Sequence, residues 1–297
     1  MPKLTVQEWR DFLPEIDKRN DPQWLEQLEE RKRLESEFHD YKHKVLKDAK
    51  EKAEAETPNA PSDTYDAIFT NRKYYRAVEG ASNYMADWIA TESKDRIFLD
   101  YCCGIGGNSI KAAKAGAALS IGIDISENSL NRAKAAAEAE GVGDRCIFIL
   151  GDAENTRLPD NSIERGVCSG VLHHLDLSFA VPELRRVAAP GARFLAGEAL
   201  DYNPAIKLYR MMTPGIRTEW EKAHILSLKD VKFTRRFFDV QNIRYWHITA
   251  IAGPHLPGNL QPMLNGLDRV LEKIPLLQLM AWMFTYEMVK PEDDKAS

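Results

Sequence analysis

The chain has 297 residues, 44% of them hydrophobic, enough to bury the core of one large domain with an extension or of two modest domains. Its formal net charge of -5 lacks the basic surplus of nucleic-acid-binding domains, so no nucleic-acid partner is expected. The four cysteines lie in predicted strands or at strand ends, unlike a secreted disulfide framework, so we expect a cytoplasmic protein. No CxxC or HExxH spacing occurs, and no metal is expected.

The first part of the chain is predicted to be helical. Residues 21–56 are charge-rich and place apolar residues three and four positions apart, which indicates a helix. The run ThrProAsnAlaProSer at 57–62 breaks this pattern, and a second helix is predicted at about 71–90. We therefore expect an N-terminal helical extension over residues 1–70 and a main domain over residues 71–297.

From residue 96 onward, strands and helices alternate. This predicts an α/β fold with a doubly wound, Rossmann-like, mostly parallel seven-stranded sheet and helices on both faces. The strands are predicted at 96–102, 119–124, 146–150, 164–169, 193–198, 239–246 and 282–289. Ser126 is placed to cap the helix after the second strand. Helical insertions at 201–226 and 249–280 are in the topological position to cover a substrate.

The first predicted strand leads into a glycine-rich turn, AspTyrCysCysGlyIleGlyGlyAsn. Glycines in such a turn let the backbone approach a ligand closely. Asp124 ends the second strand about twenty residues after Gly104, the separation expected for an acid that binds ribose hydroxyls. Both features would also suit NAD. The acid Asp100 inside the turn, Ser109 in place of the final small residue, and GlyAspAlaGlu at 151–154 disfavour an NAD-dependent oxidoreductase.

Five motifs in this order resemble class I S-adenosylmethionine (SAM) dependent methyltransferases of the small-molecule type. The motifs are LeuAspTyrCysCysGlyIleGly, GlyIleAspIleSer, GlyAspAlaGlu, AspAsnSerIleGluArgGlyValCysSerGlyValLeuHisHisLeu and LeuArgArgValAlaAlaProGlyAlaArgPhe. They lie between Arg96 and Phe194. One position departs from the family, since Cys102 stands where a glycine is usual.

The resemblance implies a set of cofactor contacts. The residues implied around the methionine part of SAM are Asp100, Cys103, Gly104 and Gly106. Asp124 would hold the ribose hydroxyls, Ile125 would pack on adenine, and Asp152 with Ala153 would read the adenine edge. For Asp100 the alternative is a turn or cap residue, and for Asp124 an N-cap partner of the next helix.

Three further residues are assigned to the cofactor on the same resemblance. Tyr74 and Tyr75 resemble the aromatic lid that many small-molecule methyltransferases fold over the SAM carboxylate, and core packing on a helix is the alternative. Ser169, at the end of the fourth strand, completes the predicted cofactor site.

Histidines supply the candidate general bases, because the unperturbed imidazole pKa of about 6.5 suits proton removal at neutral pH. His173 and His174 follow the fourth strand, and hydrogen bonding to backbone is their alternative role. His224, in the connection after the fifth strand, is the next candidate. His39, Glu198 and Asp201 are weaker candidates, because most such residues are caps or surface ion pairs.

The insertions carry apolar side chains, so the predicted acceptor is a hydrophobic small molecule, methylated at oxygen or carbon, such as a natural product, terpenoid, quinone or lipid-like compound. The alternatives are a protein or RNA acceptor, or a SAM-binding protein without catalysis. No stable membrane insertion is expected, because the most apolar segment, 274–289, is interrupted by polar residues. For the amphipathic helix at 263–274, peripheral membrane contact and a homodimer interface both stay open.

Overall fold

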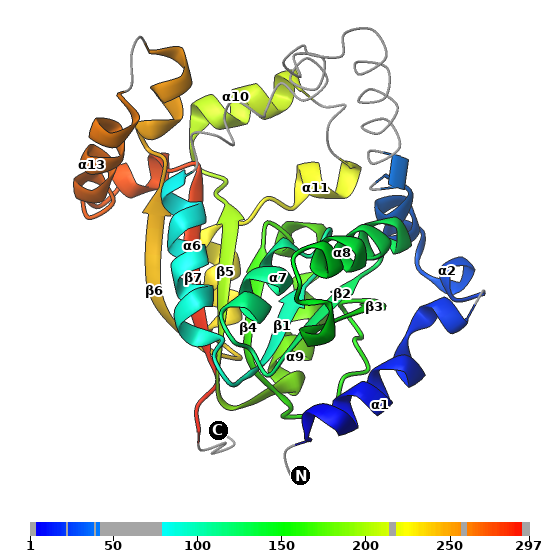
Figure 1. The fold of residues 1–297 in the computed structure, drawn as a ribbon. Helices are drawn as coiled ribbons and strands as arrows, with labels where there is room; N and C mark the ends of the chain where they lie inside the picture. Colours follow the sequence, from blue (N-terminus) through cyan, green and yellow to red (C-terminus); the bar gives the residue numbers. More distant parts are fainter. Residues whose placement is uncertain are drawn as a thin grey trace, which may run out of the picture.

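The computed structural model describes residues 4–21, 23–38, 40–41, 79–213, 218–256 and 260–292. Within these ranges, seven strands form one sheet in the spatial order β3-β2-β1-β4-β5-β7-β6 (Figure 1). The strands are β1 Ile97–Tyr101, β2 Leu119–Asp124, β3 Cys146–Leu150, β4 Ile163–Ser169, β5 Ala188–Ala199, β6 Asp239–Trp246 and β7 Met283–Val289. All seven predicted strands are confirmed, and the largest shift is the earlier start of β5.

The strand order reverses between β1 and β4. β1 pairs in parallel with both β2 and β4, while β3 and β5 extend the parallel sheet on either side. β7 is antiparallel to both β5 and β6. The predicted doubly wound, mostly parallel sheet is therefore confirmed. The carboxyl ends of β1 and β4 flank its topological switch point, where open α/β sheets bind ligands.

Helices cover both faces of the sheet, as predicted (Figure 1). One face carries α6 Glu79–Glu92, α7 Gly107–Lys114 and α8 Glu127–Ala139, and the other carries α1 Val6–Ile16, α9 Leu177–Val187 and α12 Leu228–Thr234. Because both faces are covered, all five residues of β1 are buried. The predicted cap of α8 is confirmed, since the Ser126 hydroxyl accepts a hydrogen bond from the Ser129 amide at 3.1 Å.

Helix α1 covers a part of the sheet that the connection between β3 and β4 leaves without a helix. A connection between parallel strands is usually helical, but residues 151–162, between β3 and β4, contain no helix. Trp9 and Leu13 of α1 are buried in the same core as Ile149 and Leu158. The start of the chain is therefore part of the main core.

The N-terminal extension is helical, but it is not the single helix predicted from residue 21. Helix α1 was not predicted, although a capping box between Thr5 and Glu8 begins it. The predicted stretch 21–56 is interrupted, and its helical pieces are α2 Trp24–Gln27, residues 30–38 and residues 40–41. The rest of that stretch and the start of the predicted helix at 71–90 lie outside the described residues.

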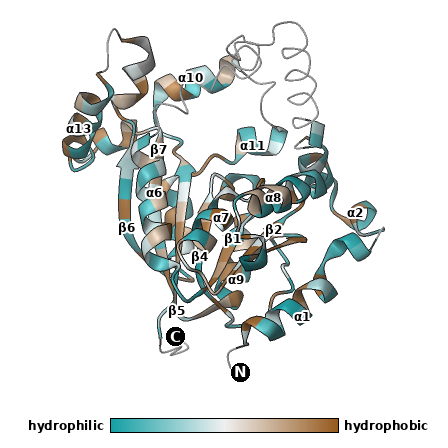
Figure 2. Cartoon of the chain, viewed as in Figure 1, coloured by the Kyte–Doolittle hydropathy of each residue, from teal (hydrophilic) through white to brown (hydrophobic). Residues whose placement is uncertain are grey.

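Both predicted insertions contain helices. They are α10 Pro204–Met212, α11 Glu219–Ala223, η5 Ala250–His255, α13 Gln261–Leu271 and η6 Leu277–Met280. α10 and α11 lie beyond the carboxyl ends of β4 and β5 (Figure 1). Figure 2 shows hydrophobic segments on α10 and α13. The large apolar residues exposed on these two helices are Leu208, Met211, Met212, Met263, Leu267 and Val270. Among the described helices, none is both long and apolar enough to cross a membrane.

The contribution of α1 to the core can be measured by truncating Leu13, which is fully buried. Leu13→Ala should lower the free energy of unfolding by about 2–5 kcal/mol, as large-to-small core substitutions do. Leu208→Ala, at an exposed position of α10, is the control and should change it by less than about 0.5 kcal/mol. If urea unfolds the Leu13→Ala chain at the wild-type concentration, α1 does not belong to the core.

A second prediction concerns His247, which follows β6 and is buried. Neither of its ring nitrogens has a hydrogen-bond partner among the described residues. Burial lowers the pKa of His247 to about 4, and the nearby Asp268 opposes this shift only in part. The unfolded chain takes up this proton below about pH 6.5. The stability that neutral His247 contributes is therefore fully present above about pH 6.5 and is lost as the pH falls toward 4. The free energy of unfolding should fall by at most about 3 kcal/mol over this range.

His247→Asn removes the titrating ring, and asparagine tolerates the positive backbone φ of 62° at this position. Urea unfolding at pH 7 and at pH 5 should show a smaller loss of stability in the variant than in the wild type. Equal losses would mean that His247 does not stay neutral in the folded protein.

Candidate functional site

The predicted ribose-binding acid lies where three segments meet. Asp124, at the end of β2, accepts a hydrogen bond from the Gly104 amide at 2.8 Å and one from the Ser126 amide at 2.9 Å. Its carbonyl accepts from the Gly151 amide at 3.0 Å. Burial raises the pKa of Asp124, although the hydrogen bonds from the Ser126 and Gly104 amides to its carboxylate act in the opposite direction. The glycine turn and the ends of β2 and β3 therefore converge on one carboxylate.

The glycine turn presents an open face at Gly104. Gly104 has a φ of +51°, and among the residues that the structure describes, its chain neighbours apart, a Cβ placed there would meet no atom within 4 Å. Gly106 has a φ of +76°, and its Cβ would lie 2.8 Å from Ala133 and 2.9 Å from Phe148, so this glycine permits close packing against α8 and β3. Cys102 also has a positive φ, 55°, which explains why a glycine is usual at this position.

Two residues assigned to the methionine part of SAM have side chains that serve the fold. Asp100 is 2% exposed and accepts hydrogen bonds from the amide and the hydroxyl of Ser109, at 2.8 and 2.9 Å. Burial raises its pKa to about 7. The Cys103 side chain packs in the core with α8 residues such as Leu130. Asp100 thus holds the start of α7, the alternative role considered for it, and its contact with SAM stays a prediction.

The residues assigned to adenine are contacted by other parts of the protein. Asp152 accepts a hydrogen bond from the Lys32 ammonium at 2.7 Å, and the carbonyl of Ala153 accepts one from the Tyr101 hydroxyl. The carbonyl of Ile125 accepts from the Ser36 hydroxyl at 3.2 Å. Direct contact of these residues with adenine stays a prediction.

Lys32 and Ser36 belong to the helical residues 30–38, which dock on this edge of the sheet. Arg31 of the same segment donates two hydrogen bonds from one nitrogen to the carboxylate of Glu154, at 2.7 and 2.9 Å, and a third to the carbonyl of His174 at 3.2 Å. This docking was not predicted from the sequence. No local pattern could have shown it, because the partners are 89 to 143 residues apart in the chain.

The first histidine candidate is held by a buried glutamate. Nδ1 of His173 lies 2.7 Å from Oε2 of Glu198, whose side chain is fully buried at the end of β5. The other oxygen of Glu198 accepts the amides of Val171 and Leu172 at 2.9 and 2.8 Å. Glu198 therefore sets both the turn after β4 and the orientation of the imidazole, a stronger role than the one predicted for it.

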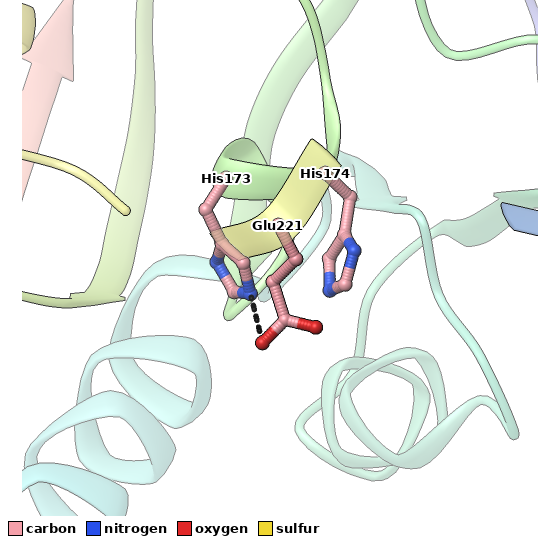
Figure 3. Close-up of side chains that lie close together, drawn as sticks. All are labelled: His173, His174 and Glu221. Carbon is pink, nitrogen blue, oxygen red and sulfur yellow. Dashed lines mark ion pairs between the residues drawn. The ribbon is translucent and has the colours of Figure 1, made fainter. Parts of the chain in front are cut away.

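The second histidine candidate is held by a glutamate from the N-terminal segment. Nδ1 of His174 lies 3.3 Å from Oε2 of Glu35, which is 5% exposed. Burial alone would lower the pKa of His174, but the hydrogen bond and the charge of Glu35 raise it above the usual value. The rings of His173 and His174 are 4.2 Å apart, and Glu221 of α11 faces both (Figure 3).

The remaining candidates are placed elsewhere or are not described. His224 is exposed at the end of α11, where its ring stacks on Trp220 at 3.7 Å and its Nδ1 contacts the Trp220 carbonyl. His224 therefore supports a helix end, and a base role for it has no geometric support. Ser169 is exposed at the end of β4. Tyr74, Tyr75 and His39 lie outside the described residues.

Comparisons with known proteins show that part of this chain is similar to methyltransferases. Residues 98–191 match the model of a family described as a methyltransferase domain. A sterol 24-C-methyltransferase of Gibberella zeae is 32% identical over 120 residues, which are 40% of this chain and 31% of the relative. A 27-O-demethylrifamycin SV methyltransferase of Amycolatopsis mediterranei is 33% identical over 117 residues, 39% of this chain and 43% of the relative. The chain thus matches less than half the length of each relative.

Two solved structures share the fold. The cyclase SpnF superposes with a TM-score of 0.51 at 18% identity, over 71% of this chain and 82% of its own. A geranyl diphosphate methyltransferase in complex with GPP and sinefungin gives a TM-score of 0.50 at 12% identity, over 71% and 78%. One is named a cyclase and the other a methyltransferase, so the fold alone does not select the reaction.

The docking of residues 30–38 can be tested at Arg31. Arg31→Ala removes the paired hydrogen bonds to Glu154, so amide hydrogen exchange in this segment should become faster while exchange in β1 and β2 stays slow. Glu37→Ala, at an exposed position of the same helix, is the control and should leave the exchange unchanged. Unchanged exchange after Arg31→Ala would show that this contact does not hold the segment.

Proposed function

We propose that this chain, whose residues 98–191 form a class I SAM-dependent methyltransferase domain, transfers the methyl group of SAM to a hydrophobic small molecule. The observation that carries the proposal is the meeting of the Gly104 turn with Asp124 at the carboxyl edge of the sheet, beside the topological switch point. The match to a methyltransferase family also speaks against the NAD-dependent oxidoreductase considered from the sequence.

The residues at this edge fit the nucleoside part of SAM. A carboxylate offers about four lone-pair positions, and the amides of Gly104 and Ser126 use one on each oxygen of Asp124. Each oxygen of Asp124 therefore keeps a lone-pair position that could accept a hydrogen bond from one of the two ribose hydroxyls. The open space beside the Cα of Gly104 would let a ligand approach the backbone there.

The acceptor is expected to be apolar around its reacting group. Leu208, Met211 and Met212 of α10 expose apolar surface beyond the carboxyl ends of the strands. Both relatives described above are named for methylation of small molecules, one at carbon and one at oxygen. A hydrophobic acceptor with a polar reacting atom fits these features better than a protein or RNA, and the net charge of -5 disfavours RNA.

His173 is the side chain we assign to the acceptor. Because Glu198 binds its Nδ1, the tautomer with the proton on Nδ1 is favoured, and Nε2 carries the lone pair. A nucleophile held about 3–3.5 Å from the methyl carbon, in line with the leaving sulfur, gains most of its rate from this placement. The acceptor forms its bond to the methyl carbon as the carbon–sulfur bond breaks, and the electron pair goes to sulfur.

Asp124 provides the first test. Asp124→Ala should weaken SAM binding by about ten- to a hundredfold, the loss expected for hydrogen bonds to a charged group, as measured by isothermal titration. Asp160→Ala, on the surface loop before β4, is the control and should bind like the wild type. Unchanged affinity in Asp124→Ala, or binding of NAD but not SAM, would contradict the proposal.

Catalysis needs a separate measurement, because a protein of this fold can bind SAM without transferring its methyl group. A panel of hydrophobic hydroxyl compounds should include one that yields S-adenosylhomocysteine and a methylated product. His173→Gln should lower kcat for that compound and leave SAM affinity nearly unchanged. SAM binding without product from any acceptor would support the SAM-binding alternative instead.

A further inference from the structure

We propose that His173, His174 and Glu221 form a site for one divalent transition-metal ion, which in turn holds an oxygen of the methyl acceptor. The site itself is independent of the proposed function, whereas the role of the ion rests on it. No metal was expected from the sequence, because the two histidines are adjacent and the glutamate lies on another element.

The three side chains converge from two elements. His173 and His174 lie on η3 Leu172–His174, and Glu221 lies on α11. One ligand atom from each lies within 4.8 Å of the other two, and all three side chains point into the same space (Figure 3). Nε2 of His173 is 4.0 Å from Oε1 of Glu221. Small rotations of these side chains would bring all three atoms to the roughly 2.0–2.2 Å at which zinc is bound.

The outer contacts of both imidazoles are those of metal ligands. A metal-binding histidine almost always donates its second ring N–H to a carboxylate or carbonyl, which fixes the tautomer and orients the ring. Here Glu198 lies 2.7 Å from Nδ1 of His173, and Glu35 lies 3.3 Å from Nδ1 of His174. Both glutamates are more than nine-tenths buried. Glu198 is thus a positioning residue that directs Nε2 of His173 toward Glu221, and Glu35 positions the neighbouring ring of His174.

The charges of the cluster also suit a dication. Three carboxylates, those of Glu35, Glu198 and Glu221, surround two imidazoles whose centres are 4.2 Å apart. One divalent ion would balance two of these negative charges while both rings stay neutral. Two imidazoles and one carboxylate favour zinc or iron(II), whereas magnesium prefers oxygen ligands and keeps several waters.

Three protein ligands leave positions open on such an ion. With Nε2 of His173 bound to the ion, His173 would act on the acceptor through the ion, in place of the direct contact proposed above. A hydroxyl oxygen of the acceptor bound there would lose its proton more readily, since a bound metal lowers the pKa of an oxygen ligand. That proton passes to solvent, the oxygen–carbon bond forms, and the carbon–sulfur bond of SAM breaks with its electron pair on sulfur. No reactant beyond SAM and the acceptor is required.

The test uses the full chain after dialysis against a chelator. Titration with zinc chloride, followed by calorimetry, should show one bound ion per chain, and magnesium chloride should show none. Glu221→Gln should weaken zinc binding at least about tenfold. Glu219→Gln, on the same helix with a side chain 92% exposed, is the matched control and should bind zinc as the wild type does. Equal zinc affinity in the two variants, or no stoichiometric binding by the wild type, would overturn the site.

A second measurement separates the site from its role. Glu198→Gln should weaken zinc binding about 10- to 100-fold, as loss of an outer carboxylate does, while SAM affinity stays unchanged; equal zinc affinity would overturn the positioning role. Methyl transfer should stop after chelation and return with zinc or iron(II). Full transfer by the chelated protein would overturn the role of the ion and leave the proposed function intact. Zinc binding without any methyl transfer would leave the site standing and count against the proposed function.

Discussion

Buried carboxylates at the carboxyl edge of the sheet organise this molecule. A carboxylate removed from water is unfavourable unless hydrogen bonds or opposite charges compensate it. Glu198 meets this condition through the turn after β4 and the ring of His173, and Glu154 meets it through Arg31. Glu35 meets it in part through His174. Through these hydrogen bonds and ion pairs, each acid holds another segment of the chain at the ends of the strands. Together these contacts form the candidate site.

The sheet could be predicted from the sequence because its strands are short apolar runs separated by turn and helix signals. β1, β2 and β3 are almost wholly buried, so their composition alone identified them. The cap of α8 could be predicted from Ser126 because capping is a local interaction. α1 was missed because its buried residues, Trp9 and Leu13, give too short a pattern, and the core that they cover lies far along the chain.

The site was predictable in outline and not in detail. The positions of Asp124 and Asp152 followed from the ends of strands, which the sequence locates well. The direction of each side chain did not follow, so the core packing of Cys103 and the hydrogen bonds from Asp100 to the start of α7 were not predicted, and the contact of both residues with SAM stays a prediction. The contacts of Glu198 and Arg31 join residues that are distant in sequence. Only the tertiary structure distinguishes His173 and His174, each facing a buried glutamate, from the exposed His224.

The position of α1 has a consequence for how the chain folds during synthesis. α1 leaves the ribosome well before its partners in the core, which include Ile149, Leu158 and Val181 and follow more than a hundred residues later. Contacts that distant in sequence close slowly, because the loop entropy is lost before the contact is gained. The apolar face of α1 therefore stays exposed while most of the sheet is being made. Chaperones that bind nascent apolar segments would meet this helix before its own core does.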